Sequence, residues 1–151
     1  MRRESREKVF QTLFMMDALG VGPDEAIALF ALASSPAPDE TYYLETVRGV
    51  HAHRDEVDVL IRRAAENWRL ERMPLVDRNI LRLGAYEICR SPDVPYAVAI
   101  NEAVDLGKRF GSEDSGSFIN GILDRISEIR MKKTGKAHRA GAGRSTEEEG
   151  A

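Results

Sequence analysis

Apolar residues recur along this chain at intervals of three and four, and this spacing restricts the fold more than any other feature of the sequence. Such a period places the apolar side chains on one face of an α-helix. Residues 3–19 show it clearly, with Phe10, Leu13 and Phe14 on one stripe. No convincing run alternates apolar and polar residues, as a half-buried strand would. The pattern therefore predicts an all-α fold.

Proline and glycine interrupt the apolar pattern and mark the ends of helices, because proline lacks an amide donor and glycine easily leaves the helical conformation. Between the interruptions the sequence predicts helices over about residues 3–19, 23–33, 40–68, 74–90, 99–110 and 118–126. The helix over 40–68 carries a near-heptad apolar stripe, which predicts a buried face made of Tyr43, Val47, Val50, Val57, Ile61, Ala64 and Trp68. We expect six to seven helices in two packed three-helix bundles. Residues 1–70 would form an N-terminal bundle with a basic arm, and residues 71–131 a C-terminal bundle. Residues 132–151 carry little apolar surface and are expected to be a disordered charged tail.

Charge is distributed unevenly along the chain. The formal net charge is −3, yet residues 1–8 hold four cations against two acids, and residues 130–151 hold six against three. The segment between them is therefore acidic. An acidic body with basic ends can offer one surface to an anion and another to a basic protein. The alternative is that the charges only keep the protein in solution.

Residues that could carry catalysis or hold a metal do not form a recognisable set. Cys89 is the single cysteine, so an internal disulfide is excluded. His51 and Asp55 share a helix face but lack a third ligand. The loop between Gly111 and Gly116 lacks the lysine of a phosphate-binding loop. We expect no enzymatic activity, no cofactor and no metal site.

The sequence also bears on location. No apolar signal core follows the charged N-terminus, and no apolar run approaches the roughly 20 residues that a membrane helix needs. With one cysteine in the whole chain, these features favour a cytoplasmic protein that makes no membrane contact.

A basic cluster at the N-terminus is the first candidate binding site. Arg2, Arg3 and Arg6 would share one helix face if the helix extends that far, and could together neutralise several phosphates. Phe14, further along the same helix, could stack on an unpaired base. It could equally pack in the core, as apolar residues at helical spacing usually do.

A polar loop before the last helix is the second candidate. Ser115 can cap that helix, and the amides of its first turn suit a phosphate. Asp114 can accept hydrogen bonds from base donors, and Asn120 can both donate and accept. The alternative is a capped helix start with no ligand.

Three segments together carry a resemblance to a known family. They are Leu-Arg-Leu-Gly-Ala-Tyr-Glu-Ile at 81–88, Val-Pro-Tyr-Ala-Val-Ala-Ile-Asn-Glu-Ala at 94–103, and Ser-Phe-Ile-Asn-Gly-Ile-Leu-Asp at 117–124. With the N-terminal arginines they resemble the NusB family of bacterial transcription antitermination factors, in order over residues 2–129. The resemblance implies two packed three-helix bundles. It also implies that the chain binds boxA RNA in ribosomal RNA leader transcripts together with NusE, a small-subunit ribosomal protein. The pair would help assemble an RNA polymerase complex that resists termination.

The resemblance also implies roles for individual residues. Those expected near RNA are Arg2, Arg3, Arg6, Arg78, Arg82, Asp114, Ser115, Ser117 and Phe118. Asp77 is expected to face NusE, although it could simply favour a helix start through the helix dipole. Phe14 stands where the family often has tyrosine, so stacking would survive but a hydroxyl hydrogen bond would not.

Two other functions stay open on the sequence. The chain could be an RNA-binding accessory domain that works with a separate ribosomal RNA methyltransferase, because NusB-like domains precede the catalytic domain of some of these enzymes. It could also form a helical homodimer with a structural or storage role.

Overall fold

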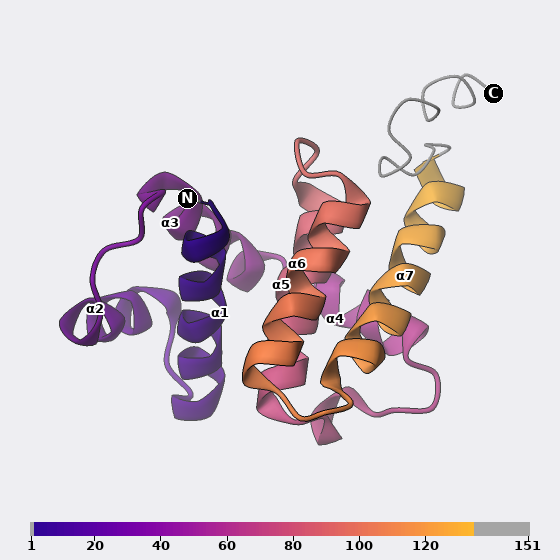
Figure 1. Cartoon of the computed structure of the whole chain (residues 1–151), viewed down its shortest axis with the longest axis horizontal. Helices are drawn as coiled ribbons and strands as arrows, with labels where there is room; N and C mark the ends of the chain where they lie inside the picture. The colour runs from indigo at the N-terminus through magenta and orange to yellow at the C-terminus, as the bar shows by residue number, and fades with distance from the viewer. Residues whose placement is uncertain (1, 135–151) are drawn as a thin grey trace.

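The structure is a computed structural model and describes residues 2–134, which fold into helices without a β-strand (Figure 1). This confirms the all-α fold. The elements are α1 (Arg2–Leu19), α2 (Pro23–Ala33), α3 (Glu40–Ala52), α4 (Arg54–Ala64), the short 3₁₀ helix η1 (Leu70–Arg72), α5 (Leu75–Arg90), α6 (Tyr96–Phe110) and α7 (Ser115–Thr134).

Helix α1 ends where the sequence predicts. Gly20 has a φ of 69°, a left-handed conformation that glycine adopts without steric cost. In this turn the amides of Gly20 and Val21 both donate to the Met16 carbonyl, at 2.9 and 3.2 Å. Pro23 then begins α2, because the first helical turn needs no amide donor at that position.

The long helix expected over residues 40–68 is wrong in the structure. Helix α3 ends at Ala52, α4 begins at Arg54, and α4 ends at Ala64. The break lies at His53, which has a φ of −108° and a ψ of 20°. The predicted apolar stripe is buried on both sides of the break, but Trp68 lies beyond α4 with 62% of its surface exposed. The spacing of the apolar residues continues unchanged across the break. The apolar period alone therefore does not show that the helix ends at Ala52.

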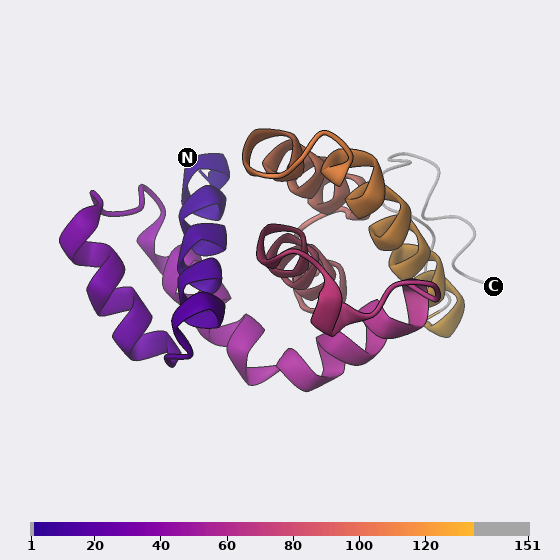
Figure 2. The same cartoon turned by 90° about the horizontal axis from the view of Figure 1, so that it is seen from below.

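The break lets the two helices pack on different partners. Helix α3 packs mainly on α1, whereas α4 packs on α5 and α7. Figure 2 shows α3 and α4 following each other along one side of the molecule and connecting the N-terminal helices to α5, α6 and α7. Helix α4 therefore packs with the C-terminal helices, although it precedes residue 70 in the chain. The division of the chain into two domains near residue 70 remains a proposal.

Helix α5 is the centre of the molecule. It contacts α1, α3, α4, α6 and α7, and the buried side chains of both groups of helices form one continuous hydrophobic cluster. At the other end of the chain, α7 continues to Thr134. Residues 132–134 are thus helical, which corrects the expected start of the disordered tail. The rest of that tail lies outside the described residues.

Candidate nucleic-acid interface

Arg2 and Arg3 lie on the surface at the start of α1. The Arg2 guanidinium donates to Asp93 at 3.2 Å, and that of Arg3 to Asp105 at 2.8 Å. Exposed ion pairs of this kind contribute about 0–1 kcal/mol to stability. Phosphate groups could therefore replace these carboxylates at little cost, and both arginines are available for an anionic ligand.

Arg6 is in a different environment, although it shares the same helix. Only 4% of its surface is exposed. Its guanidinium donates twice to the Glu87 carboxylate, at 2.9 and 3.0 Å, and the Tyr42 hydroxyl donates to the same carboxylate at 2.7 Å. Burial, together with the Glu87 charge, raises the pKa of Tyr42 far above its ordinary value. Arg6 therefore attaches the arm to α5 and α3.

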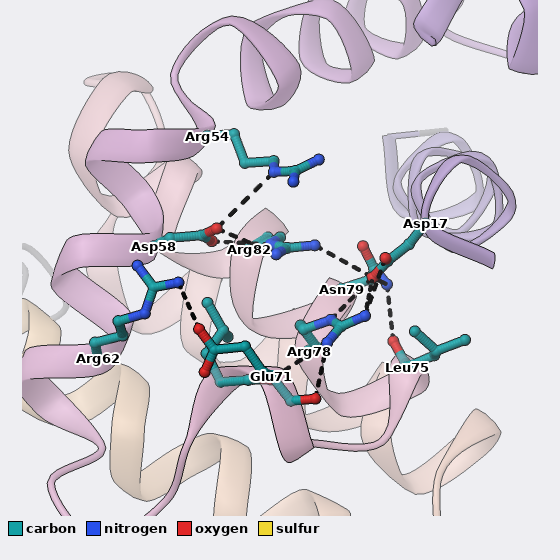
Figure 3. Close-up of polar contacts among 10 residues, drawn as sticks. Asp17, Arg54, Asp58, Arg62, Glu71, Leu75, Arg78, Asn79 and Arg82 are labelled. Carbon is teal, nitrogen blue, oxygen red and sulfur yellow. Dashed lines mark hydrogen bonds and ion pairs between the residues drawn. The ribbon is translucent and has the colours of Figure 1, made fainter. Parts of the chain in front are cut away.

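Arg78 and Arg82 belong to a second internal network (Figure 3). Arg82 donates to both oxygens of Asp58, at 2.9 and 3.1 Å, and to Asp17 at 3.2 Å. Arg78 and Asn79 also donate to Asp17, at distances from 2.9 to 3.0 Å. Burial alone would raise the pKa of Asp17, but the bonds from Asn79 and Arg78 outweigh it and lower that pKa. The network holds α1 against α4 and α5.

Asp77 and Ser115 bond to each other between the first turns of α5 and α7. Their exposed fractions are 6% and 1%, and the Ser115 hydroxyl donates to Asp77 at 2.8 Å. The same hydroxyl accepts from the amide of Ser112 at 2.9 Å. The Ser115 hydroxyl thus binds the preceding loop and α5. The sequence instead predicted that Ser115 caps α7.

A seam between α1 and α6 connects the N-terminal arm to this loop. Along the seam Arg3 bonds to Asp105, Arg109 bonds to Glu7, and the Phe10 ring packs against that of Phe110 at 5.2 Å. The two helices run in the same direction here, so the seam starts at the arm and finishes at the loop before α7. The structure thus connects the two candidate sites through one surface.

Lys108 and Arg109 are cations of this surface that the sequence analysis missed. Both are exposed in the last turn of α6. The Lys108 side chain lies over the first turn of α7, since its Cγ would be 3.2 Å from a Cβ at Gly116. The sequence feature that could have identified them as part of the candidate site is their position directly before the polar loop.

The aromatic residues are arranged differently from the sequence prediction. Phe14 is partly buried against the core and meets the Phe10 ring edge-on at 6.3 Å. Phe118 is partly buried too, and its ring contacts that of the exposed Trp68 at 5.6 Å and 83°. Asp114 and Ser117, beside Phe118 in the chain, are exposed. Trp68, expected in the core, is therefore the accessible aromatic of this surface.

Other kinds of site find no support in the part of the chain that the structure describes. Residues 2–134 hold no group of three or more potential metal ligands, and none of their helices has the length and hydropathy to cross a membrane. Fold and surface together define an all-helical protein whose exposed arginines and lysines and whose exposed Trp68 ring suit a nucleic acid.

The comparisons with known proteins agree with this class. The sequence model of the NusB family matches residues 3–128. The transcription antitermination protein NusB of Desulforapulum autotrophicum is 46% identical over 132 residues, which cover 85% of this chain and 92% of that protein. The NusB protein of Myxococcus xanthus is 45% identical and covers 83% of this chain and 94% of its own length. The chain belongs to the NusB family.

Solved structures show the same fold. NusB of T. maritima is 36% identical, with a TM-score of 0.77 and coverage of 85% of this chain and 91% of its own. A chain from a complex of the antitermination factors NusB and NusE with dsRNA is 26% identical, with a TM-score of 0.76 and coverage of 85% and 96%.

Proposed function

We propose that this protein is an RNA-binding transcription antitermination factor. With NusE it would recognise boxA-type single-stranded RNA in ribosomal RNA leader transcripts and help assemble a termination-resistant RNA polymerase complex. It would act in the cytoplasm by binding, without catalysis. The observation that carries the proposal is the fold shared, over 85% of this chain, with a chain from the complex of NusB and NusE with dsRNA.

The exposed members of the predicted site are the proposed RNA contacts. Arg2 and Arg3 would bind phosphates, while Asp114, Ser117 and Phe118 would meet bases beside the start of α7. Lys108 lies close enough to α7 to neutralise a phosphate held there. Arg6, Arg82 and Ser115 are buried, and we assign them to positioning the elements that carry the exposed contacts. Arg78 and Phe14 remain candidates, although both have partners inside the protein.

The protein partner is proposed on charge and family. The middle of this chain is acidic, and ribosomal proteins are commonly basic because they bind RNA. Complementary charge would mainly speed association and fix the orientation of NusE. Asp77 was predicted to face NusE. Because it is 6% exposed and its carboxylate accepts from Ser115 inside the protein, we assign it to holding α5 beside α7 and not to the NusE contacts.

A direct binding experiment tests the proposal. We expect a labelled boxA-type RNA to bind more tightly than a scrambled RNA of the same length, and more tightly still when NusE is present. Replacing both Arg2 and Arg3 by alanine should lower the slope of log affinity against log salt, by roughly 0.7 for each lost phosphate contact on a single strand. Equal binding of both RNAs with no effect of NusE would contradict the proposal.

Two controls make this experiment specific. Arg48→Ala removes an exposed cation of α3, distant in the sequence from the proposed contacts and paired with Asp24, and should leave the salt slope unchanged. A chain that ends at Thr134 removes the charged residues beyond it and checks that they do not account for the RNA binding. Sedimentation of the free protein and of the complex would show whether a homodimer competes with RNA.

A further inference from the structure

Trp68 presents an aromatic surface that the folded chain does not use for its core. It lies in the loop between α4 and η1, and 62% of its surface is exposed. Its ring meets Phe118 edge-on, at 5.6 Å between centroids and 83° between planes. The contact therefore places Trp68 at the first turn of α7, where Phe118 lies close in the chain to the exposed Asp114 and Ser117.

A basic groove lies further along α7 from this aromatic pair. Helices α4 and α7 contact each other, and Figure 2 shows the end of α4 meeting α7 at an angle. Between them the C-terminal end of α4 and the second half of α7 enclose an open groove of about 610 Å³. Its charged lining residues are the cations Arg63, Arg125, Lys132 and Lys133 and the acids Glu66 and Glu128. The cations therefore outnumber the acids.

The geometry of α7 places the pair and the groove on the same side of this helix. Phe118, Arg125 and Lys132 are seven residues apart, which corresponds to two turns, so they lie on one face of the helix. The Arg125 guanidinium donates to the Ala64 carbonyl at 2.7 Å and so places this face beside the end of α4. Within residues 2–134, neither Lys132 nor Lys133 forms an ion pair.

We infer that an unpaired RNA base stacks on Trp68 and that the adjoining phosphates of the same strand follow the α4–α7 groove. An exposed aromatic ring followed by a basic groove is the arrangement that single-stranded nucleic acid requires. The Phe118 ring lies at 83° to the Trp68 ring, and 62% of the surface of Trp68 remains exposed. This inference rests on the proposed function and extends its RNA surface beyond the start of α7.

Trp68 also supplies its own probe, because it is the only tryptophan of the chain. With selective tryptophan excitation of the full chain, a single-stranded boxA-type RNA should quench its fluorescence, with the same midpoint as an independent anisotropy titration of labelled RNA. A duplex of the same sequence should quench much less, because its bases are already paired. Equal quenching by the duplex would overturn base stacking.

Substitutions at Trp68 test the energetic role of the ring. Trp68→Ala should weaken single-strand binding about 5- to 100-fold, and Trp68→Phe should restore most of it, because stacking needs a ring and not the indole in particular. Leu32→Ala on α2 is the matched control, since Leu32 is an exposed apolar residue at 86% and should have no effect. Unchanged affinity of Trp68→Ala, with urea unfolding like that of the wild type, would overturn the inference.

Removing positive charge from the groove tests whether it binds RNA phosphates. Replacing Lys132 and Lys133 by glutamine should reduce the slope of log affinity against log salt, by roughly 0.7 per lost contact. The single-strand binding of the Arg48→Gln control should keep the wild-type slope. An unchanged slope in the lysine variant would remove the groove from the RNA path.

The outcomes separate this inference from the proposed function. If RNA binds by anisotropy while neither the fluorescence nor the Trp68 variants respond, the function stands and the inference fails. If no boxA-type RNA binds at all, the proposed function fails as well. If NusE alone quenches Trp68, and Trp68→Ala weakens NusE binding but not RNA binding, the ring serves the protein partner and the inference is wrong.

Discussion

At the scale of single residues, burial divides the N-terminal arginines into two kinds. Arg2 and Arg3 make surface ion pairs, whereas Arg6 is 4% exposed and bonded twice to Glu87, itself 1% exposed. The spacing of Arg2, Arg3 and Arg6 in the sequence does not distinguish them. Only their surroundings distinguish a group that is free to bind a ligand from one that holds the fold together.

The arginines give a matched pair of variants. We expect Arg6→Ala to destabilise the protein by about 3–5 kcal/mol, because it leaves the buried Glu87 charge without its partner. Arg3→Ala should cost no more than about 1 kcal/mol, because its ion pairs are exposed. Urea unfolding of both variants measures the difference. A stable Arg6→Ala protein with weakened RNA binding would instead return Arg6 to the RNA contacts.

Asp77 can be tested with a variant that removes charge and keeps shape. Asp77→Asn retains an oxygen that can accept from Ser115. Because the carboxylate is 6% exposed, we expect this variant to associate with NusE at the wild-type rate, even at low salt. Stopped-flow association is the measurement. Slower association at low salt, with unchanged thermal stability, would establish the docking role predicted for Asp77.

At the scale of elements, the α6–α7 turn depends on close approach. A Cβ at Gly111 would lie 2.3 Å from the Ser115 hydroxyl and 2.8 Å from the Gly107 carbonyl oxygen. Gly111 ends α6 as predicted, but its φ is −98°, so lack of space explains the glycine better than backbone conformation does. The turn fixes Ser115, which in turn bonds to Asp77 on α5.

Two glycine substitutions test this account. Gly111→Ala should destabilise the protein by about 1–3 kcal/mol, because the added methyl group has no space. Gly121→Ala is the control within α7, where a Cβ would meet nothing within 4 Å. It should be neutral or stabilise by about 0.5–1 kcal/mol, since alanine favours the helix. Thermal unfolding measures both, and a neutral Gly111→Ala would contradict the packing argument.

At the scale of the whole molecule, two polar clusters join the N-terminal and C-terminal helices. One centres on Glu87, a residue of α5 that accepts from Arg6 and Tyr42. The other centres on Asp17 of α1, which accepts from Arg78 and Arg82 of α5. Buried ionic groups are costly unless they are well paired. Correct pairing therefore selects one relative position of the two groups of helices, over and above the apolar contacts.

The Asp17 cluster predicts how stability depends on pH. The folded pKa of Asp17 is below its ordinary value of 3.8, so its contribution is complete above that value and is lost as the pH falls through the folded pKa. Asp17→Asn should therefore lower stability at neutral pH, and the difference from wild type should shrink in acid. Urea unfolding from neutral pH into acid measures it. Asp55→Asn, at an exposed acid of α4, is the control, and an equally large effect there would contradict the assignment.

Much of the fold could be predicted from local pattern. The apolar period reports which face of each helix is buried, and prolines and glycines report most helix ends. The break at His53 was missed because a change of helix direction depends on the partners of α3 and α4. Trp68 was placed on the stripe by the same period, although the chain leaves the helix at Ala64.

The sequence by itself determined the helical class, the buried stripes and the family, because these depend on spacing and residue type along the chain. Only the tertiary structure decided which polar residues are accessible. Arg6, Arg82 and Asp77 have the same charges in the sequence whether they face solvent or a partner, and partners such as Glu87 lie as many as 81 residues away. Desolvation and pairing are properties of packed neighbours. They bury Arg6, Arg82 and Asp77 against partners inside the protein and leave Trp68 exposed on the surface.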